Sequence, residues 1–365
     1  MASNIHMATA IPALEALQAP TADPLTLNPL STPGTARPAA AVSGHKSSVA
    51  SPPMLLGRTS QRSLNWLVFL FMLLFHVGAI AALFCFSWSA LTVAAVFYVI
   101  AINVGIGMGY HRLLTHRGYK VPKWIEYTMA VCATLSLEGG PLVWVATHRL
   151  HHQNTDVLGD PHSPHDGGWW SHAGWIIYGA GAAGQPAILA KYAPDLAKDR
   201  FYVWLTRFHW VPLVVLALIL LAIGGWPWVL WGIFLRVTVG LHATWLVNSA
   251  THMWGSKRFP TKDDSRNNWW VALLTGGEGW HNNHHAHPVS ARHGFTWYEF
   301  DVNYYGIWIL EKIGLAKKVQ VAHLDSADPK TASQRSDEIS TPHRAPVLAS
   351  SEPLRPPHPA TATTS

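Results

Sequence analysis

The sequence predicts an all-α membrane protein in which four transmembrane helices, arranged as two hairpins, carry a cytosolic helical cap. Three observations predict this fold. Charged residues make up only 13% of the 365 residues, about half of the roughly 25% found in an ordinary soluble domain. Two long stretches of the chain carry almost no charge, and clusters of histidine stand at their ends.

The apolar residues are concentrated in the middle of the chain. Residues 1–57 and 318–365 are rich in Ala, Pro, Ser and Thr and lack a periodic apolar pattern, so we expect two disordered tails. The N-terminal segment does not resemble a signal peptide, because no basic start leads directly into an apolar core. Cys85 and Cys132 are too few for a disulfide scaffold. Residues 58–317 are therefore the predicted membrane domain.

The first uncharged stretch runs from Leu64 to Tyr110 and is long enough for two membrane-spanning helices of about 20 residues each. The polar residues Ser87 to Ser89 near its middle predict a turn. We therefore expect one hairpin with spans at about 64–86 and 89–110.

The second stretch, 208–256, is of similar length but contains one charge, Arg236. The run Gly224-Gly225-Trp226-Pro227 is a turn signal and predicts spans at about 209–224 and 227–250. A lone arginine inside a span is costly. We expect it either to reach the cytosolic interface or to meet a lipid headgroup.

A fifth apolar stretch, 125–146, contains Glu138 and the helix breakers Gly139-Gly140-Pro141. A charge near the bilayer centre is unfavourable, so we predict a pair of short interfacial or half-buried helices here. Lys and Arg avoid the two short turns and gather elsewhere. The positive-inside rule therefore places both tails and the segment between the hairpins in the cytosol.

The histidines form three spaced groups and one isolated member near the predicted membrane boundaries. They are His111 and His116; His148, His151 and His152; His281, His284 and His285; and His252, which follows Asn248 by one helical turn. Residues at i, i+3 and i+4 share one face of a helix, so each HxxHH group should point one way. The i, i+5 pair is less well aligned, so we expect the helix to loosen there.

Neutral imidazole is a strong ligand for iron, copper and zinc. Nine imidazoles exceed the needs of one metal ion, whereas two ions with four or five nitrogens each would use them all. The alternative is a set of unrelated cytosolic surface histidines. Only the four-span topology keeps all groups on one side of the membrane, because a span at 125–146 would separate His111 and His116 from the rest by roughly 30 Å.

At these residues the sequence resembles the membrane-bound fatty acid desaturases. The boxes HxxxxH, HxxHH and HxxHH occur in the order typical of that family. Four segments resemble its stearoyl-type Δ9 group, namely 109–117, 160–163, 170–175 and 248–252. The segment Gly277 to His285 is similar to the cyanobacterial and plant Δ9 branch, and the resemblance covers about residues 60–315.

The resemblance implies a di-iron centre in the cytosolic cap. Its ligands would be the nine histidines named above, and Asn248 would contact one iron through water. The implied reaction is oxygen-dependent insertion of a cis double bond into a saturated acyl chain, with reduction of oxygen to water. No haem motif of a fused cytochrome is present, so the resemblance implies an external ferredoxin or cytochrome b5-like electron donor. No basic–aromatic patch suggests a nucleic-acid partner.

The acyl carrier is left open between a lipid and coenzyme A. Acyl-CoA enzymes of this family hold the CoA phosphates with basic residues, and the corresponding positions here are Ala146, Gly179 and Ala180. This difference favours a lipid-bound acyl chain. The basic residues Lys191, Lys198 and Arg200 are alternative phosphate contacts.

Acidic residues close to the boxes are candidates for orienting the ligand imidazoles. They are Asp156, Asp160 and Glu278, and the alternative is that they are ordinary loop acids. We expect His162 and His172 to make structural hydrogen bonds, and His76 and His242 either to do the same or to bind haem.

Two other functional classes remain open from the sequence. A hydroxylase, ketolase or acetylenase would share the same boxes. A metal transporter or a haem-bearing electron carrier is the second alternative, but a transporter should place its metal-binding side chains near the middle of the bilayer.

Overall fold

The computed structural model describes residues 63–179 and 184–322, and every regular element in them is a helix. Strand-like pairing in these residues is limited to isolated bridges such as Lys120 with Lys317. The all-α prediction is therefore confirmed for the described chain. The predicted N-terminal tail and residues 323–365 lie outside the described residues. Pairing continues past residue 317, because Gln320 bonds the backbone of Gly118 and Ala291.

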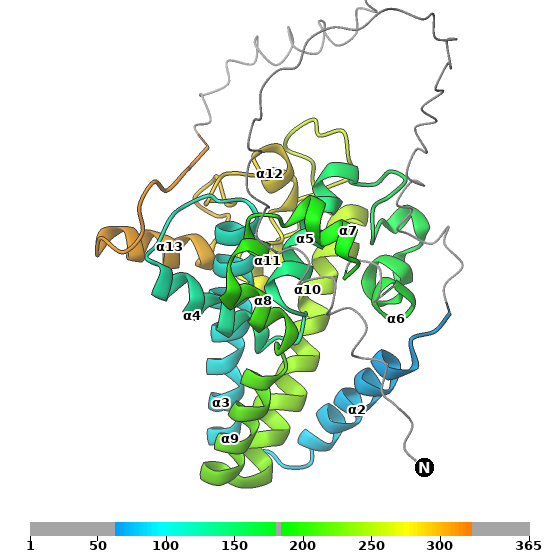
Figure 1. Ribbon diagram of the computed structural model, residues 1–365, viewed down its shortest axis with the longest axis vertical. Helices are drawn as coiled ribbons and strands as arrows, with labels where there is room; N and C mark the ends of the chain where they lie inside the picture. Colours follow the sequence, from blue (N-terminus) through cyan, green and yellow to red (C-terminus); the bar gives the residue numbers. More distant parts are fainter. Residues whose placement is uncertain (1–62, 180–183, 323–365) are drawn as a thin grey trace, which may run out of the picture. The chain divides into compact units, whose positions relative to one another are not determined.

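The helices follow one another in the order shown in Figure 1. The first half of the described chain contains α2 (Trp66–Ala82), α3 (Trp88–Tyr98), η2 (Val99–Thr115), α4 (Lys123–Thr134), α5 (Pro141–Asn154), η3 (Pro164–Asp166), η4 (Trp170–Gly174) and α6 (Trp175–Gly179). The second half contains α7 (Pro186–Tyr192), η5 (Leu196–Lys198), α8 (Arg200–Arg207), α9 (Val211–Val229), η6 (Leu230–Leu235), α10 (Arg236–Met253), α11 (Trp269–Thr275), α12 (His281–Ala286) and α13 (Val302–Lys312).

Two of the continuous helical segments are long and apolar enough to cross a membrane. They are Trp88–Thr115 and Val211–Met253, and the apolar helix α2 is shorter, with 17 residues. The second segment is kinked at Gly225, whose φ of 63° and ψ of −162° are not helical. This conformation favours glycine and lies within the predicted turn. Leu220 and Gly232, on either side of it, pack against each other, so the chain reverses here.

Polar caps delimit α2 and α3. The Asn65 side chain accepts from Val68 N at the start of α2, and the Ser87 hydroxyl accepts from Ala90 N at the start of α3. Both side chains satisfy amides that a helix start leaves unpaired. The predicted turn at residues 87–89 therefore coincides with a capped helix start.

The helix that carries the first histidine box is wound as a π-helix over Val99–Thr115. Its i→i+5 pattern continues into the box, where His116 N donates to His111 O over 3.1 Å. A π-helix brings residues five apart onto one side. The loosening of the helix that was expected at His111 and His116 is therefore this π-helical winding. Gly105 allows α4 to approach closely, because a Cβ there would lie 2.4 Å from Ala133 N.

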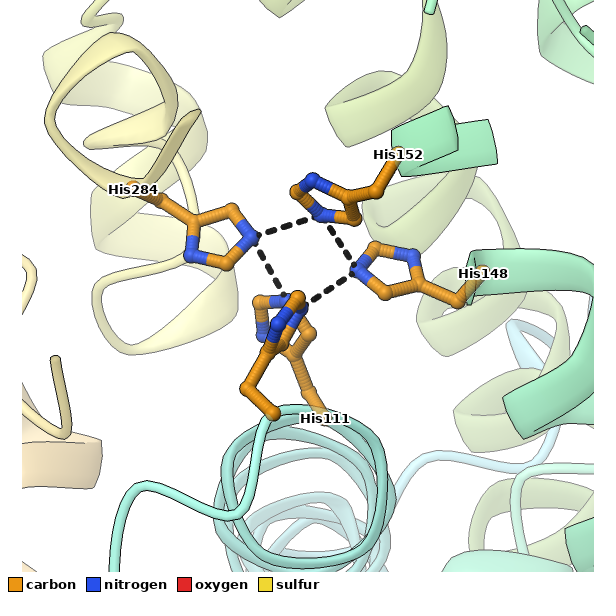
Figure 2. Close-up of side chains that lie close together, drawn as sticks. His111, His148, His152 and His284 are labelled. Atoms are coloured by element: carbon orange, nitrogen blue, oxygen red, sulfur yellow. Dashed lines mark hydrogen bonds between the residues drawn. The ribbon is translucent and has the colours of Figure 1, made fainter. Parts of the chain in front are cut away.

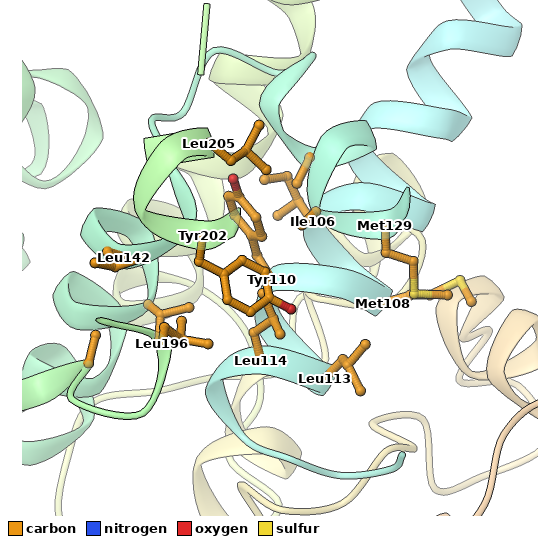
Figure 3. Packing of buried hydrophobic residues seen from close by; sticks show 14 of the residues in the cluster. Ile106, Met108, Tyr110, Leu113, Leu114, Met129, Leu142, Leu196, Tyr202 and Leu205 are labelled. Atoms are coloured by element: carbon orange, nitrogen blue, oxygen red, sulfur yellow. The ribbon is translucent and has the colours of Figure 1, made fainter. Parts of the chain in front are cut away.

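The stretch 125–146 folds into parts of two separate helices, α4 and α5, joined through Gly139 and Gly140. A buried core packs them against η2 and α8. Figure 3 shows its central side chains, among them Tyr110, Leu142 and Tyr202. Burying each such side chain contributes about 1.5–3 kcal/mol, so η2 and α5 present their histidines from a rigid base.

Arg236 follows neither of the two routes expected from the sequence. Its side chain is buried, with 2% of the residue exposed. Nε donates to Gly232 O over 3.0 Å, and Nη1 donates to Leu135 O over 2.6 Å. Leu135 is the C-cap of α4, where free carbonyls favour a cation. Arg236 therefore joins α10 to the end of α4.

Candidate metal centre

The structure brings all nine predicted histidines together in two groups. The five-histidine group contains His111, His116, His148, His152 and His284. The four-histidine group contains His151, His252, His281 and His285. Within each group, one ring nitrogen from every member lies within 4.8 Å of the others.

Each HxxHH box contributes to both groups, which differs from the expectation that its members point one way. In α5, His148 and His152 face the five-histidine group and His151 faces the other. In α12, the i, i+4 pair faces the four-histidine group and His284 the other. Residues at i and i+4 lie nearly above one another on a helix, whereas i+3 is rotated to their side. A single short helix can therefore serve two neighbouring sites.

In the five-histidine group, the Nε2 atoms converge. His152 Nε2 lies 3.1 Å from His148 Nε2 and 3.0 Å from His284 Nε2. His111 Nε2 is 3.1 Å from His284 Nε2, and His116 Nε2 is 3.1 Å from His148 Nε2. Figure 2 shows the rings of His111, His148, His152 and His284 pointing inward.

This convergence is not a satisfied hydrogen-bond network. An imidazole nitrogen either carries one hydrogen or offers one lone pair, so five Nε2 atoms can form at most two of the four contacts as proper hydrogen bonds. A transition-metal ion would accept all the lone pairs at once. Burial and neighbouring histidines lower the pKa of His116, His148, His152, His281, His284 and His285 well below the usual value. These imidazoles are neutral, as metal ligands must be.

Carboxylates hold the opposite ring nitrogen of four candidate ligands. The Nδ1 contacts are His111 with Glu278 at 2.6 Å, His151 with Asp160 at 3.0 Å, His252 with Asp156 at 2.9 Å and His285 with Asp263 at 3.0 Å. An Nδ1–H that donates to a carboxylate leaves Nε2 with its lone pair directed at the group. The three predicted acids all make such contacts. Asp263 was missed, because it belongs to no box and lies 22 residues from His285.

Glu278 belongs to a buried network that sequence reasoning did not find. Arg112 Nε and Nη2 donate to Glu278 Oε1 over 3.1 and 2.9 Å, and Nη1 lies 2.8 Å from Asp301 Oδ1. Asn303 Nδ2 also donates to Glu278 Oε1. Burial alone would raise the pKa of Glu278, but Arg112 and the neighbouring histidines hold it well below its usual range. The carboxylate is therefore ionised and locked in place.

A tenth histidine, His293, lies beside the five-histidine group. Its ring centre is 4.5 Å from that of His284, and its Nδ1 is 3.3 Å from Glu278 Oε2. Neither of its buried ring nitrogens has a hydrogen-bond partner in the described chain. No spacing pattern links His293 to a box, so the sequence offered no signal for it.

The other histidines lie outside the two groups. His162 packs on His151, with ring centres 4.4 Å apart. His172 contacts Ser249 Oγ through Nδ1 and His242 through Nε2, and His242 Nε2 is 3.0 Å from His76 Nε2. The expected structural hydrogen bonds are therefore found for His76, His172 and His242, whereas the buried Nδ1 of His162 has no hydrogen-bond partner in the described chain.

An apolar cavity of about 970 Å³ reaches both groups. Its lining includes His111 and His148 from the five-histidine group, His281 from the other, and also Asn248 and Glu278. Among the described residues, those that line the cavity include no lysine or arginine. The cavity can therefore place an uncharged, elongated molecule beside the two groups.

Glu138 is an acidic residue in this apolar lining. Its Oε2 accepts from Trp144 Nε1 over 3.0 Å, whereas Oε1 is buried and has no partner in the described chain. Burial raises the pKa of Glu138 from 4.5 to about 7. The folded protein therefore retains a proton that the unfolded chain loses between these two values.

This difference predicts a pH-dependent stability. The contribution of Glu138 to the free energy of unfolding should decline as the pH rises from 4.5 to about 7, because the ionised carboxylate is unfavourable in a buried position. Near the lower end of this pH range, Glu138→Gln should unfold at the same temperature as the parent. Above the upper end, it should unfold at a higher temperature than the parent. Thermal unfolding in detergent across this range measures the effect. The exposed control Glu311→Gln should follow the parent throughout, and equal curves for both variants would refute the assignment.

The contact between Asp263 and His285 predicts a second effect. Asp263→Asn should weaken metal retention about 10- to 100-fold, the usual cost of removing an outer partner of a ligand histidine. Metal content after dialysis against graded chelator is the measurement. The neighbouring Asp264→Asn is the control, because its half-exposed carboxylate contacts His165 and Lys257 instead. Equal retention in the two variants would show that Asp263 does not support the site.

Comparison with known proteins places the chain among enzymes of lipid unsaturation. The family model described as fatty acid desaturase matches residues 86–302. The chain is 44% identical over 271 residues to an sn-1 stearoyl-lipid 9-desaturase of Anabaena variabilis, which covers 74% of this chain and 98% of the relative. It is 45% identical over 263 residues to an sn-2 palmitoyl-lipid 9-desaturase of Nostoc sp. (strain 36), covering 72% and 92%. An acyl-CoA 5-desaturase of Anemone leveillei is 43% identical over 249 residues, covering 67% and 76%.

Proposed function

The chain belongs to the fatty acid desaturase family and is a desaturase, and from this premise we propose that it introduces a cis double bond at Δ9 into the saturated acyl chain of a membrane lipid. The observation that carries this proposal is the apolar cavity that reaches both histidine groups. The similar 9-desaturases act on stearoyl- and palmitoyl-lipids. The reaction consumes one O₂, two electrons and two protons, takes two hydrogens from adjacent carbons, and yields two waters.

The two histidine groups would hold two iron ions. The five-histidine group would bind one, and the four-histidine group, with Asn248 through a water, the other. When bound, the irons supply the redox chemistry that an unactivated methylene requires, since it has no proton acidic enough for a general base. The protein's own part is positional. Carboxylates orient the imidazoles, and the cavity keeps the acyl chain beside them and away from water.

The carrier proposal is supported by the surroundings of the cavity. Ala146, at a position where acyl-CoA enzymes have a basic residue, is fully buried, and Ala180 lies outside the described residues. Lys191, Lys198 and Arg200 are exposed but do not line the cavity. No described cation is therefore placed to receive the phosphates of coenzyme A at this cavity.

We also propose the predicted topology for residues 58–317, with spans in two hairpins and the histidine groups in a cytosolic cap. The two long apolar segments and the apolar α2 support it. The proposal keeps the tails on the cytosolic side as well. All nine histidines can share one centre only if their boxes lie on the same side of the bilayer.

An external one-electron donor, a ferredoxin or a cytochrome b5-like protein, would reduce the centre. A second, smaller opening supports this route. It is lined by His116 and His152 from one group and His285 from the other, together with Arg149 and Asp263. It offers an approach to both groups that does not pass through the apolar cavity.

The test is expression in a host that lacks its own desaturase. Double-bond position should be determined separately in each lipid class and in the acyl-CoA pool. The expected result is Δ9-unsaturated chains that appear first in membrane lipids. An oxygenated chain without a new alkene would overturn the desaturase assignment in favour of hydroxylation. If the unsaturated chains appear first in the acyl-CoA pool, the proposed lipid carrier is overturned.

A further inference from the structure

The helix α2 is packed along only half of its length. Its buried residues are Gly78, Ala79 and Ala82, all in the C-terminal half. There the Phe234 side chain covers Gly78, and Trp231 Nε1 donates to Ala82 O over 2.8 Å. The N-terminal half, from Trp66 to Phe75, contains no buried residue.

The same unpacked half forms one wall of the acyl cavity. The α2 residues that line the cavity are Leu67, Val68, Phe71, Met72, Phe75 and His76, which recur at the spacing of one helical face. Leu67 and Phe71 line the cavity and are still 45% and 53% exposed. On the other face, Leu70 is 55% exposed and equally apolar. The wall is thus a single helix with apolar side chains on both faces.

Other parts of the cavity wall are backed by the protein core. Ile102, Ile106 and Trp245 line the cavity and are no more than 5% exposed. In Figure 1, α2 runs at an angle to α3 and α9 rather than alongside them. Like α6, which also lines the cavity and contains no buried residue, the N-terminal half of α2 therefore has little packing to lose if it moves.

Few polar contacts hold this half of α2 in place. Asn65 N donates to Ile177 O over 2.9 Å at the helix start. Near the middle of the helix, His76 Nε2 lies 3.0 Å from His242 Nε2. Thr238 Oγ1 donates to Phe75 O over 3.2 Å. These contacts lie at the two ends of the row of cavity-lining residues on α2.

We infer that the N-terminal half of α2 is the side wall through which the acyl chain of a membrane lipid enters the cavity, moving about its packed C-terminal half. This inference rests on the proposed lipid substrate. A lipid whose chain had to reach the cavity from the cytosol would expose its methylenes to water, which the hydrophobic effect opposes. An opening between α2 and α6 or α10 lets the chain pass from bilayer to cavity without leaving an apolar medium. The headgroup then stays at the level of Asn65 and the start of the helix.

A reversible cross-link tests this movement. Asn65→Cys with Ile177→Cys, in a chain with Cys85→Ala and Cys132→Ala, joins residues whose backbones are hydrogen-bonded and so close enough for a disulfide. In its reduced form this variant should desaturate lipid vesicles. In its oxidised form the rate should fall at least about tenfold, which a barrier increase of about 1.4 kcal/mol would produce, and a reductant should restore it. Iron content should be the same in both forms.

The matched control is Lys120→Cys with Lys317→Cys in the same background. These residues exchange two backbone hydrogen bonds of 2.8 Å and do not line the cavity. Oxidation of this control should leave the rate unchanged. If the oxidised α2 variant is as active as its reduced form, the inference is overturned while the proposed function stands. If the parent chain with all its native residues fails on every lipid vesicle, the proposed function itself fails.

A second pair of variants needs no disulfide. Val68→Trp fills the cavity side of α2, whereas Leu70→Trp adds the same bulk on the opposite face. Val68→Trp should raise the KM for lipid by about tenfold or more, the effect of obstructing entry by roughly 1.4 kcal/mol. Leu70→Trp should stay within about twofold of the parent. Equal KM values for the two variants would overturn the inference even if the cross-linked protein did not fold.

Discussion

His284→Ala should abolish desaturation and empty the five-histidine group of iron. Its side chain is completely buried, and its Nε2 lies within 3.1 Å of both His111 Nε2 and His152 Nε2. Removing it takes a central nitrogen from the group, where neutral imidazoles are the proposed ligands. Product formation should fall below detection, and bound iron should drop by about half if two ions are present.

His151→Ala should have the same effect on activity through the four-histidine group. The control for both variants is His287→Ala, two residues after the end of the third box. The His287 ring packs on Phe259 and Phe295 and belongs to neither group, so this variant should keep its activity within about twofold. All three proteins should still insert into the membrane. Unsaturated products from either of the first two variants would remove that histidine from the ligand set.

Arg112→Ala should be the most destabilising single change in the site. Arg112 is 1% exposed and contacts the carboxylates of Glu278 and Asp301. Removing one partner of a buried ion pair typically costs about 3–5 kcal/mol, because the remaining charges are left without compensation. Glu278 would also lose the anchor that directs it at His111 Nδ1. We expect a markedly lower unfolding temperature together with loss of iron.

Arg117→Ala provides the matched comparison on the same segment. The Arg117 side chain is 63% exposed and pairs with Asp195 at the surface. Surface pairs contribute about 0–1 kcal/mol, so this variant should unfold close to the parent. Thermal unfolding in detergent, or limited proteolysis, measures the stability of both variants. Similar unfolding of the two variants would contradict a structural role for the buried network.

Local patterns of the sequence predicted the features that depend on neighbouring residues. The turn at Gly225 could be predicted because glycine, tryptophan and proline interrupt an uncharged run. The loosened helix at His111 and His116 could be predicted because a spacing of five does not match the α-helical repeat. Two metal sites could be expected because nine imidazoles are too many for one.

Contacts between distant segments could not be predicted in this way. Asp263 supports His285 across a loop, and Arg112 meets Asp301 from another element 189 residues along the chain. Neither pair has a fixed spacing that a pattern could reveal. Arg236 was expected at an interface or a headgroup, but its partner is a carbonyl on α4. In each case the tertiary arrangement of the chain, rather than spacing along it, selects the partner.

The sequence by itself determined the helical class, the uncharged runs and the identity of the nine candidate ligands, because these follow from composition and from spacing along one helix. Only the tertiary structure decided how the ligands divide. It turns the i, i+4 members of each HxxHH box toward one group and the i+3 member toward the other, since α5 and α12 lie between the two. It also placed the apolar cavity beside both groups and left half of α2 unpacked at its side. Those features arise from how the helices are arranged around one another, and no local pattern carries that information.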